Sequence, residues 1–145
     1  MTAFSDEVRD AVAGRAGDRC EYCHLPTRGQ VATFPIDHVL PRSSGGETIL
    51  DNLALACPHC NAHKWAHTSG VDPLSGATVP LFHPRRQLWP DHFQWSVQEL
   101  GVLEGKTSCG RATIAQLHIN DADIVSIRQL LATLGLFAEI SGAAS

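Results

Sequence analysis

The sequence predicts an α+β protein in which two short strands and a helix form a compact core, and a C-terminal extension ends in a further helix. Three observations indicate this class. Two Cys-x-x-Cys pairs enclose a β-prone stretch, the second pair opens a helical segment, and apolar residues recur at helical spacing near the C-terminus. A length of 145 residues fits one domain, so we expect a core over residues 1–68 and an extension over residues 69–145 that packs on it.

The expected elements of the core follow in order along the chain. Ser5 is placed to cap a first helix that Gly17 ends. The stretch 31–40 predicts a short strand and residues 53–56 predict a second one, with a Pro- and Gly-containing loop between them. Residues 57–66 predict a helix that starts in the second cysteine pair. Two strands and a helix would therefore surround the cysteines.

The extension has a different pattern. Residues 72–76 predict a turn, residues 92–105 a hairpin and residues 113–119 a helix that follows Gly110. A last packing helix is predicted after a cap at residue 120 or 121, because apolar side chains recur there at helical spacing. These are Ile124, Ile127, Leu131 and Leu134.

Composition and charge exclude several classes of protein. Hydrophobic residues make up 43% and charged residues 18%, as in folded globular proteins. No apolar run approaches the roughly 18 residues of a membrane span, and the first residues are acidic where a secretory leader is basic, so a cytoplasmic location is expected. The net charge of −4 argues against binding nucleic acid by bulk electrostatics. Any contact with DNA must be local.

Four of the five cysteines have the spacing of a zinc site. Two thiolates on each of two tight turns complete a tetrahedral shell, which here would consist of Cys20, Cys23, Cys57 and Cys60. Two disulfides or a redox-active pair are the alternative, which a reducing cytoplasm disfavours. Cys109 has no neighbour with ligand spacing and is expected to be a buried free thiol.

A run of residues around the cysteine pairs resembles the HNH endonuclease family. The elements of its pattern stand in order as Asp37-His38, Pro41, Gly45-Gly46, Asn52-Leu53, Asn61 and Lys64. The resemblance implies the ββα-metal fold, in which a hairpin and a helix hold one divalent ion. Beyond residue 67 the chain looks like small stand-alone bacterial HNH proteins.

Phosphodiester hydrolysis assigns a chemical role to each of these residues. His38 is the expected general base, since a neutral imidazole accepts a proton near pH 7. Asp37 and Asn61 offer oxygen ligands to a catalytic Mg²⁺ or Mn²⁺. Asn52 is expected to tie the loop and orient His38 by hydrogen bonding. Lys64, three residues after Asn61 on the same helix face, is expected to hold a phosphate.

His63 is the alternative to Asn61 as a metal ligand. His59, His63 and His67 recur every four residues, and an imidazole ligand would favour Ni²⁺, Co²⁺ or Zn²⁺. His63 lies about 200° around the helix from Asn61, however, while Asn61 and Lys64 share a face. We therefore expect Asn61 to complete the shell.

Two further groups of side chains bear on nucleic-acid binding. Arg85-Arg86 is the only adjacent basic pair in the sequence, and it is either a solvated surface pair or a contact to DNA backbone. Trp65, Trp89 and Trp95 are expected to pack rather than to stack on bases.

The sequence thus predicts a zinc-stabilised endonuclease that cuts DNA with a catalytic divalent ion. A non-catalytic zinc ribbon that binds nucleic acid or protein is the main alternative. The Asp37-His38 pair favours the nuclease, because a ribbon requires neither residue. An HNH nuclease that acts on RNA is a third possibility.

Overall fold

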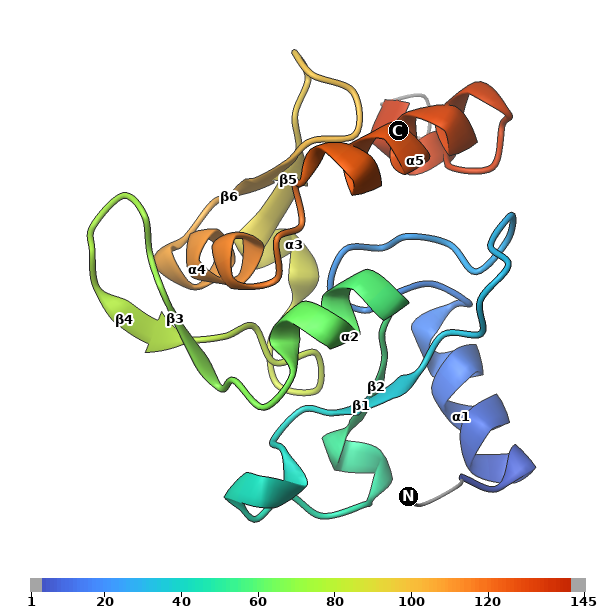
Figure 1. Ribbon diagram of the computed structural model, residues 1–145, viewed down its shortest axis with the longest axis vertical. Coiled ribbons are helices and arrows are strands. Elements are labelled where there is room, and N and C mark those ends of the chain that lie inside the picture. Colours follow the sequence, from blue (N-terminus) through green and yellow to red (C-terminus); the bar gives the residue numbers. More distant parts are fainter. Residues whose placement is uncertain (1–3, 142–145) are drawn as a thin grey trace.

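A computed structural model describes residues 4–141 of the chain and shows the predicted α+β architecture (Figure 1). The N-terminal part contains the helix α1 (Asp6–Ala16), the strands β1 (Ile36–His38) and β2 (Leu53–Leu55), and the helix α2 (Pro58–Lys64). β1 and β2 pair antiparallel, with His38 opposite Leu53. Two short 3₁₀ helices, Arg42–Ser44 and Leu50–Asn52, lie in the loop between the strands. Two strands and one helix therefore form the core, as expected.

The caps of α1 confirm the predicted first helix. The Ser5 hydroxyl accepts a hydrogen bond from the Val8 amide at 3.2 Å. Gly17 adopts φ 69°, a left-handed conformation that glycine enters without steric cost, and its amide donates to the Ala13 and Gly14 carbonyls. The first strand is shorter than expected, because Pro35 has no N–H to donate to a ladder and Val31 is fully exposed.

Residues 69–141 of the extension contain two hairpins, three helices and a final 3₁₀ turn. The predicted turn at 72–76 connects a pair of strands that the sequence did not reveal, β3 (Ser69–Val71) and β4 (Thr78–Pro80). The predicted hairpin over 92–105 is confirmed, with Phe93 opposite Gly105. The elements are β3 (Ser69–Val71), β4 (Thr78–Pro80), α3 (Trp89–His92), β5 (Phe93–Trp95), β6 (Leu103–Gly105), α4 (Ser108–Gln116), α5 (Ala122–Thr133) and η3 (Ala138–Ser141).

Helix α4 begins earlier than the sequence predicted. Thr107 caps it by accepting a hydrogen bond from the Gly110 amide at 3.0 Å, so Gly110 lies inside the helix instead of preceding it. A Cβ at Gly110 would lie 2.1 Å from the His92 carbonyl oxygen. The glycine therefore serves close packing of α4 on the β5–β6 hairpin rather than helix termination.

The buried face of α5 also differs from the prediction. Ile124 and Leu131 are buried, but Ile127 and Leu134 are 40% and 62% exposed. Arg128 is fully buried instead, and it donates from Nε to the Gly101 carbonyl and from Nη2 to the Ile119 carbonyl, both at 2.7 Å. The sequence prediction used the spacing of apolar residues, and it could not place the charged Arg128 on the buried face of α5.

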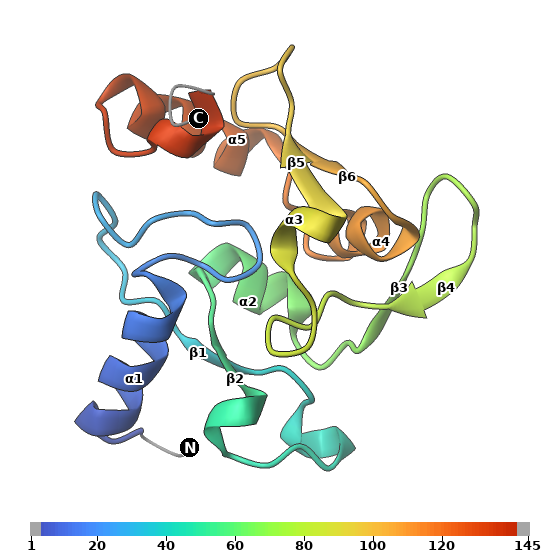
Figure 2. The same cartoon turned by 180° about the vertical axis from the view of Figure 1, so that it is seen from behind.

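One hydrophobic core joins the two parts of the molecule. It contains Val12 and Leu55 from the N-terminal part and Phe82, Phe93 and Leu117 from the extension. Helix α2 lies between α1, β1 and β2 on one side and the extension on the other, as the views from front and back agree (Figures 1 and 2). Across residues 4–141, no helix is long and apolar enough to cross a membrane.

Candidate nuclease site and metal centre

The four cysteines of the two pairs meet in the interior. All four are fully buried, and their sulfur atoms lie within 4.8 Å of one another. In each pair the first sulfur accepts a backbone hydrogen bond from the second cysteine, at 3.4 Å in Cys20–Cys23 and 3.3 Å in Cys57–Cys60. Four thiol ligands gathered on two tight turns fit a structural zinc ion. The same Cys57 sulfur caps the start of α2, so a bound ion would fix that helix.

Arg128 supplies a positive charge close to this cluster. Burial lowers the pKa of its guanidinium, while the four neighbouring cysteines act in the opposite direction. Its Nη1 is buried and has no hydrogen-bond partner among residues 4–141. A Zn²⁺ ion with four thiolates carries a net charge of about −2, which would compensate this cation. The Arg128 cation, which comes from the extension, therefore suits a negatively charged zinc site electrostatically.

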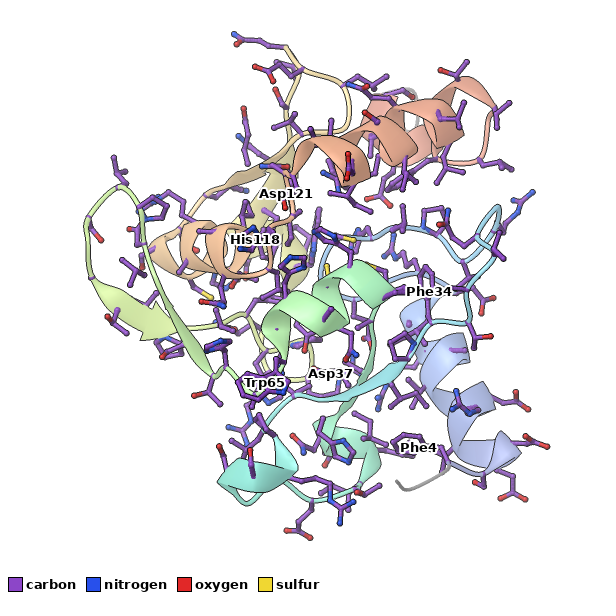
Figure 3. All side chains as sticks on the ribbon, viewed as in Figure 1. Phe4, Phe34, Asp37, Trp65, His118 and Asp121 are labelled. Atoms are coloured by element: carbon purple, nitrogen blue, oxygen red, sulfur yellow. The ribbon has the colours of Figure 1, made fainter. Side chains whose placement is uncertain are left out.

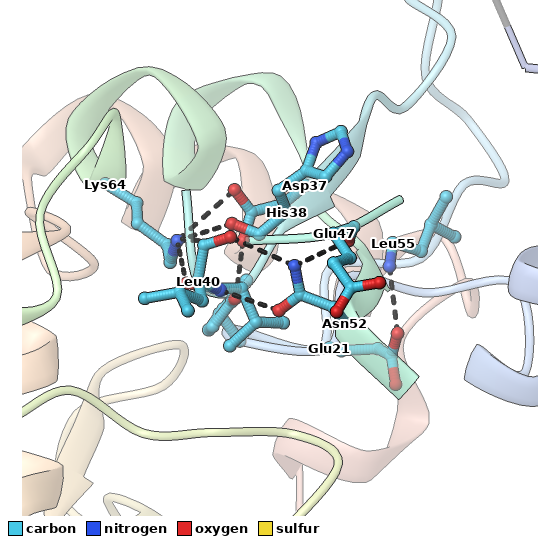
Figure 4. A network of polar contacts seen from close by, with 10 residues as sticks. Glu21, Asp37, His38, Leu40, Glu47, Asn52, Leu55 and Lys64 are labelled. Carbon is cyan, nitrogen blue, oxygen red and sulfur yellow. Dashed lines mark hydrogen bonds and ion pairs between the residues drawn. The ribbon is translucent and has the colours of Figure 1, made fainter. Parts of the chain in front are cut away.

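Asp37 is buried on the inward face of β1 (Figure 4). The Tyr22 hydroxyl donates to its Oδ2 at 2.7 Å, and Lys64 Nζ lies 3.0 Å from the same oxygen. Burial raises the pKa of Asp37, while Lys64 and the Tyr22 hydrogen bond oppose that rise. Tyr22 was not singled out from the sequence, although its place between two zinc ligands points it into the core.

Lys64 is an interior residue rather than the phosphate contact that the sequence predicted. Its side chain is 1% exposed. Besides Asp37, the ammonium donates to the His38 carbonyl at 3.2 Å and to the Val39 carbonyl at 3.0 Å. These acceptors use all of its N–H groups, so in this arrangement Lys64 positions β1 and the Asp37 carboxylate.

His38 lies on the opposite face of β1, because successive side chains of a strand alternate. Its ring is partly exposed and points away from Lys64 (Figure 4). The Nε2 atom lies 2.8 Å from the Thr48 hydroxyl oxygen, and the Phe4 ring packs nearby at 5.9 Å between centroids. Partial burial lowers the pKa of His38, against the attraction of Asp37. A lowered pKa keeps the imidazole neutral at pH 7, as a general base requires.

Asn52 ties the loop that carries Thr48. Its Oδ1 accepts from the Leu40 amide at 2.8 Å, and its Nδ2 donates to the carbonyls of Leu40 and Glu47 at 3.0 and 2.9 Å. The expected hydrogen bond from Asn52 to His38 is absent from residues 4–141. Thr48, which the sequence analysis missed, makes that contact instead. Its only signal was a hydroxyl residue shortly after Gly45-Gly46.

The two candidate ligands on α2 are separated in space. Asn61 is partly buried one turn before Lys64. The His63 ring packs instead at 4.5 Å from the His118 ring, in the extension. His118 and Asp37 lie on opposite sides of α2 (Figure 3). The structure therefore directs His63 away from Asp37.

The basic pair is divided between the interior and the surface. Arg85 forms an ion pair with Glu21, with side chains only 13% and 9% exposed, and burial lowers its pKa to about 10. Arg85 is therefore corrected from a surface residue to an interior one. Arg86 is exposed and lines a cavity of about 670 Å³, together with Asn52 and His83. Of the two arginines, Arg86 is therefore the exposed one.

The three tryptophans also divide. The indole of Trp89 donates to the Tyr22 carbonyl at 2.9 Å and that of Trp95 to Glu139 at 3.0 Å, and both pack against the core as expected. Trp65 follows α2 with φ 44° and is 76% exposed. The expectation that Trp65 packs is wrong, because the left-handed turn at the end of α2 directs it outward.

Comparison with known proteins finds one family that matches this core and one similar protein. Residues 20–66 match the family described as HNH endonuclease, and this is the segment that holds the cysteine cluster, Asp37 and His38. The chain is also similar to the Septu protein PtuB of Bacillus thuringiensis, with 25% identity over 129 residues. That match covers 87% of this chain and 46% of the relative, so the chain spans about half the length of the relative.

Proposed function

We propose that this protein is a metal-dependent endonuclease that hydrolyses phosphodiester bonds of DNA, with His38 as general base. The HNH domain carries the inference to a nuclease. The observation that carries the assignment of the base is the position of His38, which is accessible, held by Thr48 and biased toward the neutral form.

His38 performs the proton transfer in this proposal. With Nε2 held by Thr48, Nδ1 is the nitrogen that takes a proton from the attacking water. The water oxygen forms a bond to phosphorus as the bond to the 3′ oxygen breaks, and the departing oxygen is protonated from solvent. Neutral imidazole is consumed as a base and restored when its proton returns to water.

The catalytic ion is proposed to be Mg²⁺ or Mn²⁺ at Asp37 and Asn61. Such an ion supplies counter-charge to the phosphorane-like transition state, and the oxygen donors of both residues suit it chemically. In the structure, however, Lys64 and the Tyr22 hydroxyl both bind the Asp37 carboxylate, so that carboxylate is not available to coordinate an ion. The proposal therefore requires Lys64 to release Asp37 when ion and substrate bind.

Contact with the substrate backbone is assigned to Arg86. The protein has net charge −4, so its attraction for DNA must come from a few local cations. Arg86 is exposed at the cavity that Asn52 and Lys64 also line, near the loop that carries Thr48. Lys64 and Arg85 are proposed to act through Asp37 and Glu21 rather than on phosphate.

Cleavage of supercoiled plasmid with Mg²⁺ tests this function. Wild-type protein should produce nicked or linear DNA, and His38→Ala should not, while zinc content and DNA binding persist. His92→Gln is the control, since it removes an imidazole of the extension that bonds to Thr107 and lies outside the lining of the Arg86 cavity. Labelled single-stranded RNA is tested in parallel. Cleavage of RNA alone would reassign the substrate, and binding without cleavage of either polymer would favour the zinc-ribbon alternative.

A further inference from the structure

A second group of side chains of metal-ligand type lies on the side of α2 that faces away from Asp37. His59 and His63 stand one turn apart on α2, and Asp121 approaches them from the start of α5. The ligand atoms of the three residues lie within 4.8 Å of one another. Figure 3 shows Asp121 and His118 together on this side of the helix.

Both histidines are oriented as metal ligands usually are. His59 Nε2 donates to the His118 carbonyl at 2.7 Å, and His63 Nδ1 donates to the His59 carbonyl at 2.9 Å. A backbone carbonyl that holds one ring nitrogen fixes the tautomer and leaves the other nitrogen free to bind a metal. Within the described part of the chain, His59 Nδ1 and His63 Nε2 accept no hydrogen bond. The centroids of the two rings lie 4.3 Å apart.

The carboxylate of Asp121 does not cap helix α5. Aspartate at the N-cap position commonly accepts a backbone hydrogen bond from the first turn. Asp121 is the N-cap of α5 and makes no such bond. Its Oδ2 lies instead 3.3 Å from His118 Nδ1. His118 has φ 52°, a strained conformation for a residue with a Cβ, and this turn holds its carbonyl against His59.

We propose that His59, His63 and Asp121 bind one transition-metal ion of the Zn²⁺ or Ni²⁺ type, with water completing its shell. Two imidazoles and a carboxylate suit these ions and disfavour Mg²⁺. The ion joins the HNH helix to the extension, because its ligands come from α2 and from the start of α5. This site is distinct from the four-cysteine cluster and from the ion proposed at Asp37, and it does not depend on nuclease activity.

Nickel binding by zinc-loaded, tag-free protein tests the proposal. After equilibrium dialysis against Ni²⁺, elemental analysis should find about one nickel per chain with the zinc content unchanged. His63→Gln and Asp121→Asn should each weaken nickel binding at least tenfold, whereas His67→Gln and His38→Ala should not. Asp121 makes no capping hydrogen bond that Asp121→Asn would remove, so α5 should still form.

A thermal measurement on the same samples gives a second readout. Nickel at about 100 times its dissociation constant should raise the midpoint of unfolding by about 5–10 °C in wild type. The increase should disappear in Asp121→Asn. Nickel binding that is lost in His38→Ala but retained in His63→Gln would place the ion at β1 and overturn the proposal. Binding that survives both His63→Gln and Asp121→Asn would also overturn it.

Discussion

The HNH segment and the extension differ in the interactions that hold them. In the HNH segment β1 and β2 have three residues each and α2 has seven, whereas α4 and α5 in the extension have nine and twelve. Helices of a few turns are marginal without tertiary support. Besides the shared hydrophobic core, the short elements of the HNH segment therefore rely on the cysteine cluster and on buried polar side chains.

In the extension, contacts between aromatic side chains stabilise the packing of the elements. Phe82 and Phe93 meet edge to face at 5.2 Å, and Trp95 and Phe137 meet in the same way at 5.7 Å. The contrast indicates that the HNH segment depends on the four-cysteine cluster and on the Lys64–Asp37 ion pair. These can be removed selectively, which gives ways to test the comparison.

Loss of the zinc site should have the largest effect. We expect Cys57→Ser to unfold the HNH segment, because it removes one of four buried ligands together with the cap of α2. Circular dichroism and elemental analysis measure helix content and bound zinc. Cys109→Ser is the matched control, since this half-buried thiol lies outside the cluster. A folded Cys57→Ser protein without zinc would show that packing on the extension suffices.

Breaking the buried ion pair should have the next largest effect. Lys64→Met should lower the free energy of unfolding by about 3–5 kcal/mol, because it leaves the Asp37 carboxylate buried and uncompensated. Burial already raises the pKa of Asp37, and losing Lys64 should raise it further. The carboxyl group becomes neutral as pH falls through that pKa, so the deficit should shrink between neutral and acidic pH.

Urea denaturation of both single variants and the double variant measures this coupling. Asp37→Asn with Lys64→Met should be more stable than Lys64→Met alone, since no charge remains buried. Strictly additive losses would mean that the pair does not act as a unit, and would weaken the contrast between the two parts of the molecule.

The two adjacent arginines should give smaller and different effects. Arg86→Ala should reduce the slope of log affinity against log salt by about 0.9, as expected for one phosphate contact. Arg85→Ala should leave that slope unchanged and lower the free energy of unfolding by about 1–3 kcal/mol, because Glu21 loses its buried partner. DNA binding in a salt titration and denaturation provide the two readouts. A reduced slope in Arg85→Ala would contradict its interior assignment.

Local patterns in the sequence were sufficient to predict much of the fold. Cysteine spacing predicted the cluster, Ser5 and Gly17 predicted the ends of α1, and the turn at 72–76 was found from its composition. Each of these signals is complete within a few residues or within one repeated motif. They predict where an element begins and ends, and which thiols meet.

Contacts between distant residues were not predictable in this way. Tyr22 with Asp37, Glu21 with Arg85, and His59 with His118 join segments that no local rule pairs. Adjacent residues such as Arg85 and Arg86 look equivalent in the sequence, but the turn that carries them buries one and exposes the other. Their roles depend on tertiary packing.

The central claim is that His38 is the general base on the exposed face of β1, and the pH dependence of plasmid cleavage tests it most directly. Because the base must be neutral and the pKa of His38 is lowered, wild-type kcat/KM should rise with pH through a midpoint below the ordinary pKa of histidine and then level off. His38→Ala should reduce cleavage by ~10²–10⁴-fold at the plateau and abolish that rise, with DNA affinity unchanged. Full cleavage by His38→Ala with the same pH profile would contradict the account.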